Sequence, residues 1–204
     1  DTPNASQPKT VYGYDEQSNF TSQTDARGNT TRYHFDLLSR RVGTTMPLGQ
    51  LSSTVYDSVG NVLSETNFNG ERIDFTYDAL NRLTRRELPD GSHFAFTYTP
   101  TGMRSTIVDA RGTTSYTYDA RDRVLSRTEP DGVAISYEYD LAGNEISQTT
   151  PAGTVFKTYN PLRQLATVTD TKGGVTTYGY DNRGRLVETQ FPNGTTDLLI
   201  LDEL

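Results

Sequence analysis

The sequence repeats itself every 20 or 21 residues, and this period restricts the fold more than any other feature. Each copy contains one recurring position, which we call the Asp slot. The residue just before this slot is Tyr or Phe in all nine complete copies, and the residue two places before that Tyr or Phe is aromatic in seven. Such short tandem copies are typical of repeat proteins, in which each unit packs on its neighbours. The slot itself, usually aspartate, falls at positions 15, 36, 57, 78, 99, 119, 140, 160 and 181.

Two aromatic positions separated by one residue predict a β-strand with one aromatic face. Residues i and i+2 of a strand point to the same side, so the aromatic slots form a stripe along a sheet. This alternation predicts half-buried antiparallel strands, with the stripe serving as the sheet's own core. The opposite face is mostly small or polar, with Gly13, His34, Val55, Thr76, Thr97, Thr117, Glu138, Thr158 and Gly179.

Each copy also carries two turn signals. The first follows the Asp slot, as in Asp57–Asn61, where the carboxylate can accept from a backbone N–H two residues on and a later Gly supplies positive φ. The second contains Gly, as in Pro130–Gly132. Some copies depart from the first signal, and there we expect looser or differently shaped turns. The departures are Thr99 and Asn160 in the Asp slot, and Ser18, Ser39 and Arg163 in the Gly position.

These signals predict two strands and two turns in every repeat. The predicted fold is all-β, with tandem β-hairpin repeats of about 21 residues that form one long, curved or spiralling antiparallel sheet. We expect residues 1–9 to be a disordered or irregular leader, and residues 10–204 to be a single array of about nine repeats plus a partial one. The 21 aromatic residues and 17 Gly favour this fold over disorder.

Composition excludes several classes of protein. With no Cys, the chain can form neither a disulfide scaffold nor a thiolate metal site. Its 26 acidic and 19 basic residues disfavour nucleic acid as a partner, because binding to phosphates needs a concentrated positive charge. No apolar run is long enough to predict a membrane span, and the opening Asp1–Ser6 does not resemble a signal peptide. That opening suggests a segment of a longer protein.

No residue pattern predicts catalysis, a cofactor or a metal site. One Asp per repeat at a fixed turn position favours a turn device over an acid/base pair or a calcium ladder. His34 and His93 are the only histidines, and strand parity places both on the polar face, exposed to solvent. The chain is therefore predicted not to be an enzyme. The predicted structural anchors are Tyr14, Asp15, Phe35, Asp36, Tyr56, Asp57, Tyr77, Asp78, Tyr98, Tyr118, Asp119, Tyr139, Asp140, Tyr159, Tyr180 and Asp181.

The pattern G-x-x-x-x-Y-x-Y-D-x-x-G-R-L resembles the Tyr-Asp (YD) repeat of the Rhs family, over residues 10–204. Phe75–Leu83, Tyr116–Val124 and Tyr178–Leu186 match it best. The resemblance implies a bacterial polymorphic toxin, the C component of a Tc toxin or, more distantly, a teneurin. The sequence contains no Asp-Pro, so the D-P-x-G-L motif of the self-cleaving protease that follows many such repeats is missing here.

In that family the repeats form a sheet that spirals into a hollow shell around a C-terminal toxin. The resemblance thus implies a shell segment whose partners are flanking repeats and an enclosed toxin domain, secreted or delivered by a bacterial secretion system. The alternative is a secreted or cell-surface ribbon that binds carbohydrate through its aromatic stripe. An isolated segment is expected to self-associate through its open sheet edges.

Overall fold

The computed structural model describes residues 9–199, which form 19 β-strands and no helix. The prediction of an all-β chain of tandem repeats is confirmed. No helix in this range has the length and hydropathy needed to cross a membrane. The predicted leader at residues 1–9 falls almost wholly outside the described range, as does the last Asp slot at position 202. The single array over residues 10–204 stays a prediction.

The strands belong to two compact units. One unit runs to Phe96 and takes in Val108–Ala110, and the other comprises Thr97–Ile107 and the described chain from Arg111 onward. The first contains β1 (Val11–Tyr14), β2 (Phe20–Thr24), β3 (Thr30–Phe35), β4 (Arg41–Thr45), β5 (Leu51–Tyr56), β6 (Val62–Thr66), β7 (Arg72–Tyr77), β8 (Leu83–Glu87) and most of β9 (His93–Tyr98). The second contains most of β10 (Arg104–Asp109) and then β11 (Gly112–Tyr118), β12 (Val124–Thr128), β13 (Ala134–Tyr139), β14 (Glu145–Thr150), β15 (Gly153–Tyr159), β16 (Leu165–Thr169), β17 (Val175–Tyr180), β18 (Leu186–Gln190) and β19 (Thr196–Leu198).

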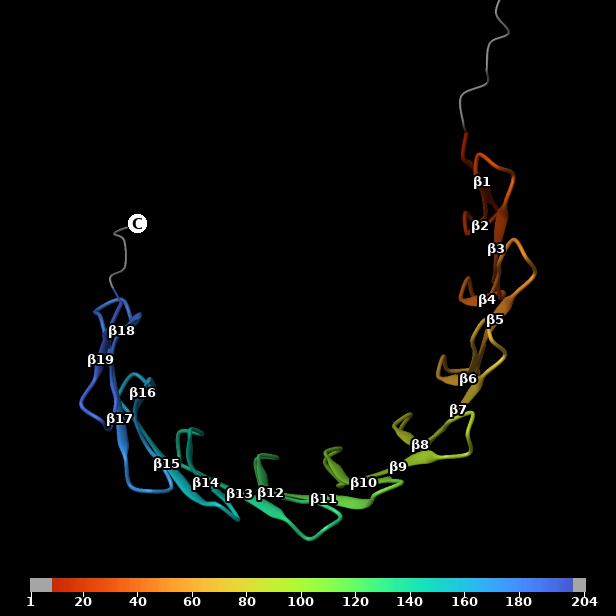
Figure 1. Cartoon of the computed structure of the whole chain (residues 1–204). Coiled ribbons are helices and arrows are strands. Elements are labelled where there is room, and N and C mark those ends of the chain that lie inside the picture. The colour runs from red at the N-terminus through yellow and green to blue at the C-terminus, as the bar shows by residue number, and fades with distance from the viewer. Residues whose placement is uncertain (1–8, 200–204) are drawn as a thin grey trace, which may run out of the picture. The chain divides into compact units, whose positions relative to one another are not determined.

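Within each unit the strands form a meander, in which every strand pairs antiparallel with the next strand of the chain (Figure 1). The odd-numbered strands from β1 to β17 end in the Tyr or Phe that precedes the Asp slot, and even-numbered strands follow the turn that this slot begins. All Asp slots of a unit consequently lie at one margin of its sheet. We call these loops the Asp turns, and the loops at the opposite margin the Gly turns.

A β-bulge follows each Asp turn whose register the structure gives. Thr117 pairs with Ser126 but Tyr118 pairs with Val124, so Leu125 is an extra residue on β12. The same shift recurs at Tyr14, Phe35, Tyr56, Tyr77, Tyr139, Tyr159 and Tyr180. A bulge bends its strand and increases the local twist. The repeat therefore has a regular bend that strand alternation alone does not predict.

The prediction that atypical turns are looser or differently shaped is wrong. Ser18, Ser39 and Arg163 have φ of 65°, 56° and 62°, in the left-handed region that the glycines of the other turns also occupy. Their N–H groups donate to the carbonyl three residues earlier over 2.9–3.0 Å, as in the Gly-containing turns. The Thr99 and Asn160 turns keep the same two backbone hydrogen bonds. The loop length and the strand pairing around it impose the turn shape.

Two Gly turns, after β10 and after β14, leave only two residues between strands, and each accounts for a repeat of 20 residues. At the usual Gly turn five residues separate paired strand ends, as between Thr66 and Arg72. Thr150 instead pairs with Gly153, so only two residues form the turn between β14 and β15. Both strands are extended toward the turn, and the rest of the ladder keeps its alternation. The step from Asp140 to Asn160 thus loses one residue without exchanging the two faces.

Among residues 9–199 no apolar side chain is buried. The buried residues of this range are Gly43 and four residues with small hydroxyl side chains, Thr44, Ser64, Thr114 and Ser147. The aromatic stripe is mostly half-buried, as the alternation in β13 illustrates, so the expectation that it forms a core of its own is wrong. Because a single layer has no opposing layer, the stripe stays partly accessible to solvent.

The two histidines lie in different environments. His34 is exposed, as expected, and its Nε2 lies 2.8 Å from the Thr45 hydroxyl. His93 is half-buried at the start of β9, where it pairs with Glu87 of β8, so the expectation of full exposure is wrong there. Cross-strand neighbours cover part of a side chain even on the polar face.

Candidate functional site

The predicted anchors lie at the sheet margin that the Asp turns form. Each aromatic anchor is the last residue of an odd-numbered strand, and the Asp slot is the next residue. Strand pairing brings together anchors that are one repeat apart in the sequence. The arrangement is a row of similar turns along one side of each unit, in which only near neighbours such as Asp15, Phe35 and Asp36 line a common hollow.

The Asp turn is held by hydrogen bonds to one carboxylate. Asp140 Oδ1 accepts from the backbone N–H of Asn144 at 2.8 Å, and Oδ2 accepts from its side-chain amide at 2.8 Å. Two backbone bonds complete the loop, from Asp140 N–H to the Asn144 carbonyl and from Gly143 N–H to the Asp140 carbonyl. The side-chain bond from Asn144 is the main reason that the pKa of Asp140 is lowered, against a smaller effect of burial. The carboxylate is charged at neutral pH.

In other turns an arginine takes the place of this asparagine. Arg123 Nε donates to Asp119 Oδ2 at 2.7 Å, and its N–H donates to Oδ1 at 3.0 Å. The side-chain bond from Arg123 is the main cause of the lowered pKa of Asp119. Asp36, Asp78 and Asp181 make the same pair with the arginine four residues later.

These arginines also connect consecutive repeats. Arg123 donates through Nη1 to the carbonyl of Asp140 in the next Asp turn, at 3.2 Å, and its guanidinium lies 4.5 Å from the ring centroid of Tyr139. Arg40 makes the same two contacts in the first unit, with Asp57 and Tyr56. One side chain therefore closes its own turn, fixes the next turn and covers an aromatic ring.

The tyrosines of the stripe form a second connection between repeats. The hydroxyl of Tyr77 donates to the carbonyl of Val62, the first residue of β6, at 2.9 Å. Burial raises the pKa of Tyr77, so its hydroxyl remains a donor. Equivalent bonds join Tyr56 to Arg41, Tyr118 to Arg104, Tyr139 to Val124, Tyr159 to Glu145, and Tyr180 to Leu165.

Sequence reasoning missed the arginine and tyrosine contacts between repeats. A signal for the arginines was present, since Arg40, Arg82, Arg123 and Arg185 each follow an Asp slot by four residues. No comparable signal identified the hydroxyl acceptors. Backbone carbonyls are the same at every position, and only the bulge and the register decide which one a tyrosine reaches.

The Asp turns offer little for acid/base chemistry, because their carboxylate oxygens already accept two or more hydrogen bonds. Within residues 9–199 no group of three or more His, Cys, Asp and Glu is placed to hold a metal ion. What the arrangement does provide is mechanical continuity within each unit, because strand pairing, arginine contacts between turns and tyrosine hydroxyls connect neighbouring repeats.

The RHS Repeat family model matches six stretches of this chain, residues 14–51, 56–93, 77–114, 98–134, 118–155 and 159–196. Each stretch begins at an aromatic anchor and spans nearly two periods. Together they cover most of the chain. A comparison with curated proteins found no match.

Solved structures share the fold at low sequence identity. The crystal structure of TcdB2-TccC3-Cdc42 aligns with 90% of this chain and 12% of that chain, at 20% identity and a TM-score of 0.57. The Photorhabdus luminescens Tc holotoxin pore, with a TccC3 variant, aligns with 88% of this chain and 13% of that chain, at 18% identity and a TM-score of 0.55. The chain thus spans about an eighth of those chains, and the likeness shows the fold alone.

Proposed function

The chain belongs to the RHS repeat family, and from this premise we propose that it is a wall segment of a toxin shell, which encloses a C-terminal effector until delivery. Its partners would be the flanking repeats of the same shell and the enclosed effector domain. The whole protein would be secreted, or delivered by a bacterial secretion system. The wall segment itself catalyses nothing in this proposal.

The observation that carries the proposal is the combination of connected repeats with the absence of a buried apolar side chain among residues 9–199. A protein that is stabilised by a buried core needs at least two packed layers, whereas each unit of this chain is one layer held by contacts that recur between repeats. Arg123 and Tyr139 illustrate these contacts, since each bridges two repeats. Such a layer encloses volume with few residues and needs no reactive group.

The Tc relatives support the role at the level of fold. Those structures are a Tc holotoxin pore and TcdB2-TccC3, and the portion of each that aligns with this chain has the same fold. We therefore assign the predicted anchors a structural role in the wall, with the Asp residues shaping turns and the aromatic residues connecting repeats.

The test uses the full-length protein that carries this segment. A protease site is placed between the last repeat and the C-terminal domain, and its cleavage is followed over time. Enclosure predicts that the site is protected, and that Arg40→Gln together with Arg123→Gln exposes it by loosening the wall. A variant with Arg32→Gln, an exposed arginine on β3, is the control and stays protected.

Rapid cleavage in the unaltered protein would contradict enclosure. A glycan array with the same protein addresses the carbohydrate-binding alternative. Saturable binding of an oligosaccharide by this segment, without protection of the C-terminal site, would favour an adhesion ribbon over a container.

A further inference from the structure

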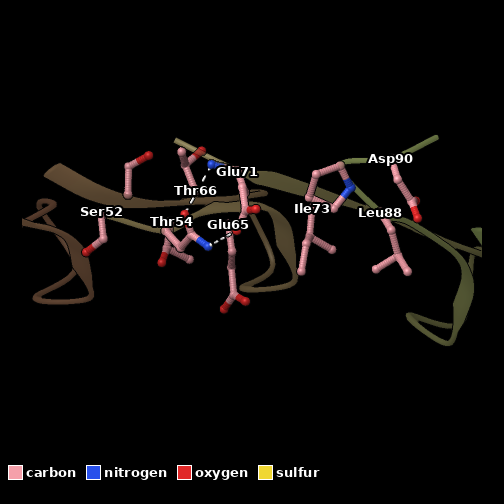
Figure 2. Close-up of a pocket in the computed structure, with 11 residues that line it drawn as sticks. Ser52, Thr54, Glu65, Thr66, Glu71, Ile73, Leu88 and Asp90 are labelled. Carbon is pink, nitrogen blue, oxygen red and sulfur yellow. Dashed lines mark hydrogen bonds between the residues drawn. The ribbon is translucent and has the colours of Figure 1, made fainter. Parts of the chain in front are cut away.

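The aromatic stripe is interrupted once in the first unit, at Thr54. This slot holds Tyr or Phe in seven repeats, and the preceding position on the same face is Ser52, also small. Where the ring is missing, the sheet has a shallow hollow of about 550 Å³ over β5, β6 and β7, which extends to the turn after β8. Figure 2 shows the side chains of Thr54, Glu65, Ile73 and Leu88 projecting from the same side of the ribbon.

The hollow combines an apolar wall with hydroxyl and acidic groups. Ile73, Leu88 and Pro89 supply the apolar surface, and no lysine or arginine lines it. Three of its lining residues are acidic. The remaining polar lining consists of Ser52, Ser53, Thr54, Thr66 and Asn67.

Glu65 is the acid in this hollow that is left without a partner. It is exposed, it pairs directly across the ladder with Thr54, and it makes no hydrogen bond or ion pair with another described residue. The other two acids are engaged locally. Glu71 accepts from the Asn67 amide at 2.7 Å, and Asp90 accepts from the backbone and hydroxyl of Ser92.

A second repeat shows how this kind of gap is filled within the same protein. In the eighth copy the aromatic residue is replaced by Lys157, whose ammonium lies 2.6 Å from Glu145 on the neighbouring strand β14. The lysine stem takes the place of the ring, and its charge meets a carboxylate. At Thr54 a carboxylate is again present on a neighbouring strand, but the chain supplies no stem and no cation.

From this complementarity we infer that the Thr54 hollow binds a lysine or arginine side chain of a polypeptide segment lying on this face. The aliphatic stem would pack against Ile73 and Leu88, and the cation would pair with Glu65. The inference rests on the hollow and its charges, and holds whether or not the sheet encloses an effector. A single exposed pair with modest apolar contact implies weak affinity, which several such contacts along one polypeptide would raise.

The test is a titration of the isotope-labelled 204-residue chain, followed by amide chemical shifts in NMR spectra. The probe is an acetylated and amidated Gly-Thr-Lys-Thr-Gly peptide, and its partner has norleucine in place of lysine. We expect saturable shifts at Glu65, Thr66 and Ile73 with the lysine peptide, and binding about fivefold weaker with norleucine, the size of an exposed ion pair.

Two variants define the site. Glu65→Gln keeps the shape of the hollow and is expected to reduce binding to the norleucine level, whereas Thr54→Tyr fills the gap and abolishes the shifts. Glu16→Gln, at an exposed residue in a distant Asp turn of the same unit, is the matched control and retains binding. Equal binding of the two peptides, unchanged binding by Glu65→Gln, or saturation of the same signals by a malto-oligosaccharide would each overturn the inference.

Discussion

The hydroxyl of Tyr139 donates a hydrogen bond to the carbonyl oxygen of Val124, 2.9 Å away and fifteen residues earlier in the chain. The two residues lie at the same margin of neighbouring strands, one at the end of β13 and the other at the start of β12. The bond therefore crosses from one repeat to the previous one. It gives this half-buried aromatic residue a directional role in a sheet that buries no apolar side chain among residues 9–199.

Removing this hydroxyl is expected to lower stability. Tyr139→Phe loses one hydrogen bond and leaves a carbonyl without its partner, which costs about 1 kcal/mol in the free energy of unfolding. Urea unfolding measures this loss of stability. Tyr137→Phe is the matched control, since the Tyr137 hydroxyl makes no hydrogen bond to another described residue, and it should stay within about 0.5 kcal/mol. Equal losses would show that the interaction between repeats does not depend on the Tyr139 hydroxyl.

Arg123→Gln should destabilise the second unit more than the loss of a surface charge does. The change removes the Asp119 ion pair, the bond to the Asp140 carbonyl and the contact with the Tyr139 ring together. We expect a lower urea midpoint, measured against Arg32→Gln as the control. A double-mutant cycle with Tyr139→Ala should reveal coupling between the two residues. Additive effects would place the stabilisation within the turn alone.

Stability should fall in acid. Hydrogen bonds hold the pKa of the Asp-turn carboxyl groups below the unfolded value of about 3.9. A lowered folded pKa means that this stabilisation is complete above about pH 4 and is lost as the pH falls through the folded values. Thermal melts between pH 7 and 2 measure it. Asp140→Asn should make the acid limb shallower, while Asp197→Asn, at an exposed aspartate that makes no hydrogen bond with another described residue, should leave it unchanged.

At turn positions with positive φ, replacing glycine should lower the free energy of unfolding, and introducing glycine should raise it. Gly70 has φ of 82° with open space where a Cβ would lie, so Gly70→Ala costs about 1 kcal/mol from backbone strain alone. Gly70→Asn should cost less, because Asn tolerates this region. Arg163→Gly relieves the same strain and should stabilise by up to about 1 kcal/mol. The urea midpoints of the three variants and the unaltered chain measure these changes in stability. A lower midpoint for Arg163→Gly would contradict the strain argument.

The isolated chain should self-associate through its terminal strands. β1 pairs with β2 and β19 with β18, and the other edge of each faces no strand of its own unit. Their exposed Tyr12 and Leu198 carry no charge to block pairing. Sedimentation velocity should show association that Tyr12→Lys with Leu198→Lys suppresses. Leu38→Lys, at an equally exposed turn position, should not change it, and a double variant that still associated would exclude edge pairing.

The period, strand order and turn positions could be predicted because they depend on local patterns, namely alternation and turn residues. The bulge at Leu125 could not, since it arises from closing a five-residue turn between paired strands. The left-handed backbone at Arg163 was missed for the same reason, as pairing overrides residue preference. The hollow at Thr54 was also missed, because alternation identifies a face but not the volume that one absent ring leaves.

The two-residue turn at Pro151 and Ala152 has a consequence for how such chains can change in length. The shorter connection at this margin is accommodated by the turn, and the pairing between Ser147 and Phe156 keeps the side chains of both strands on their usual faces. At the other margin the bulge and the Asp-centred bonds fix the residue count. Insertions, grafted peptides and affinity tags are therefore best accommodated in the Gly turns, where the chain can gain or lose residues while successive strands keep their pairing.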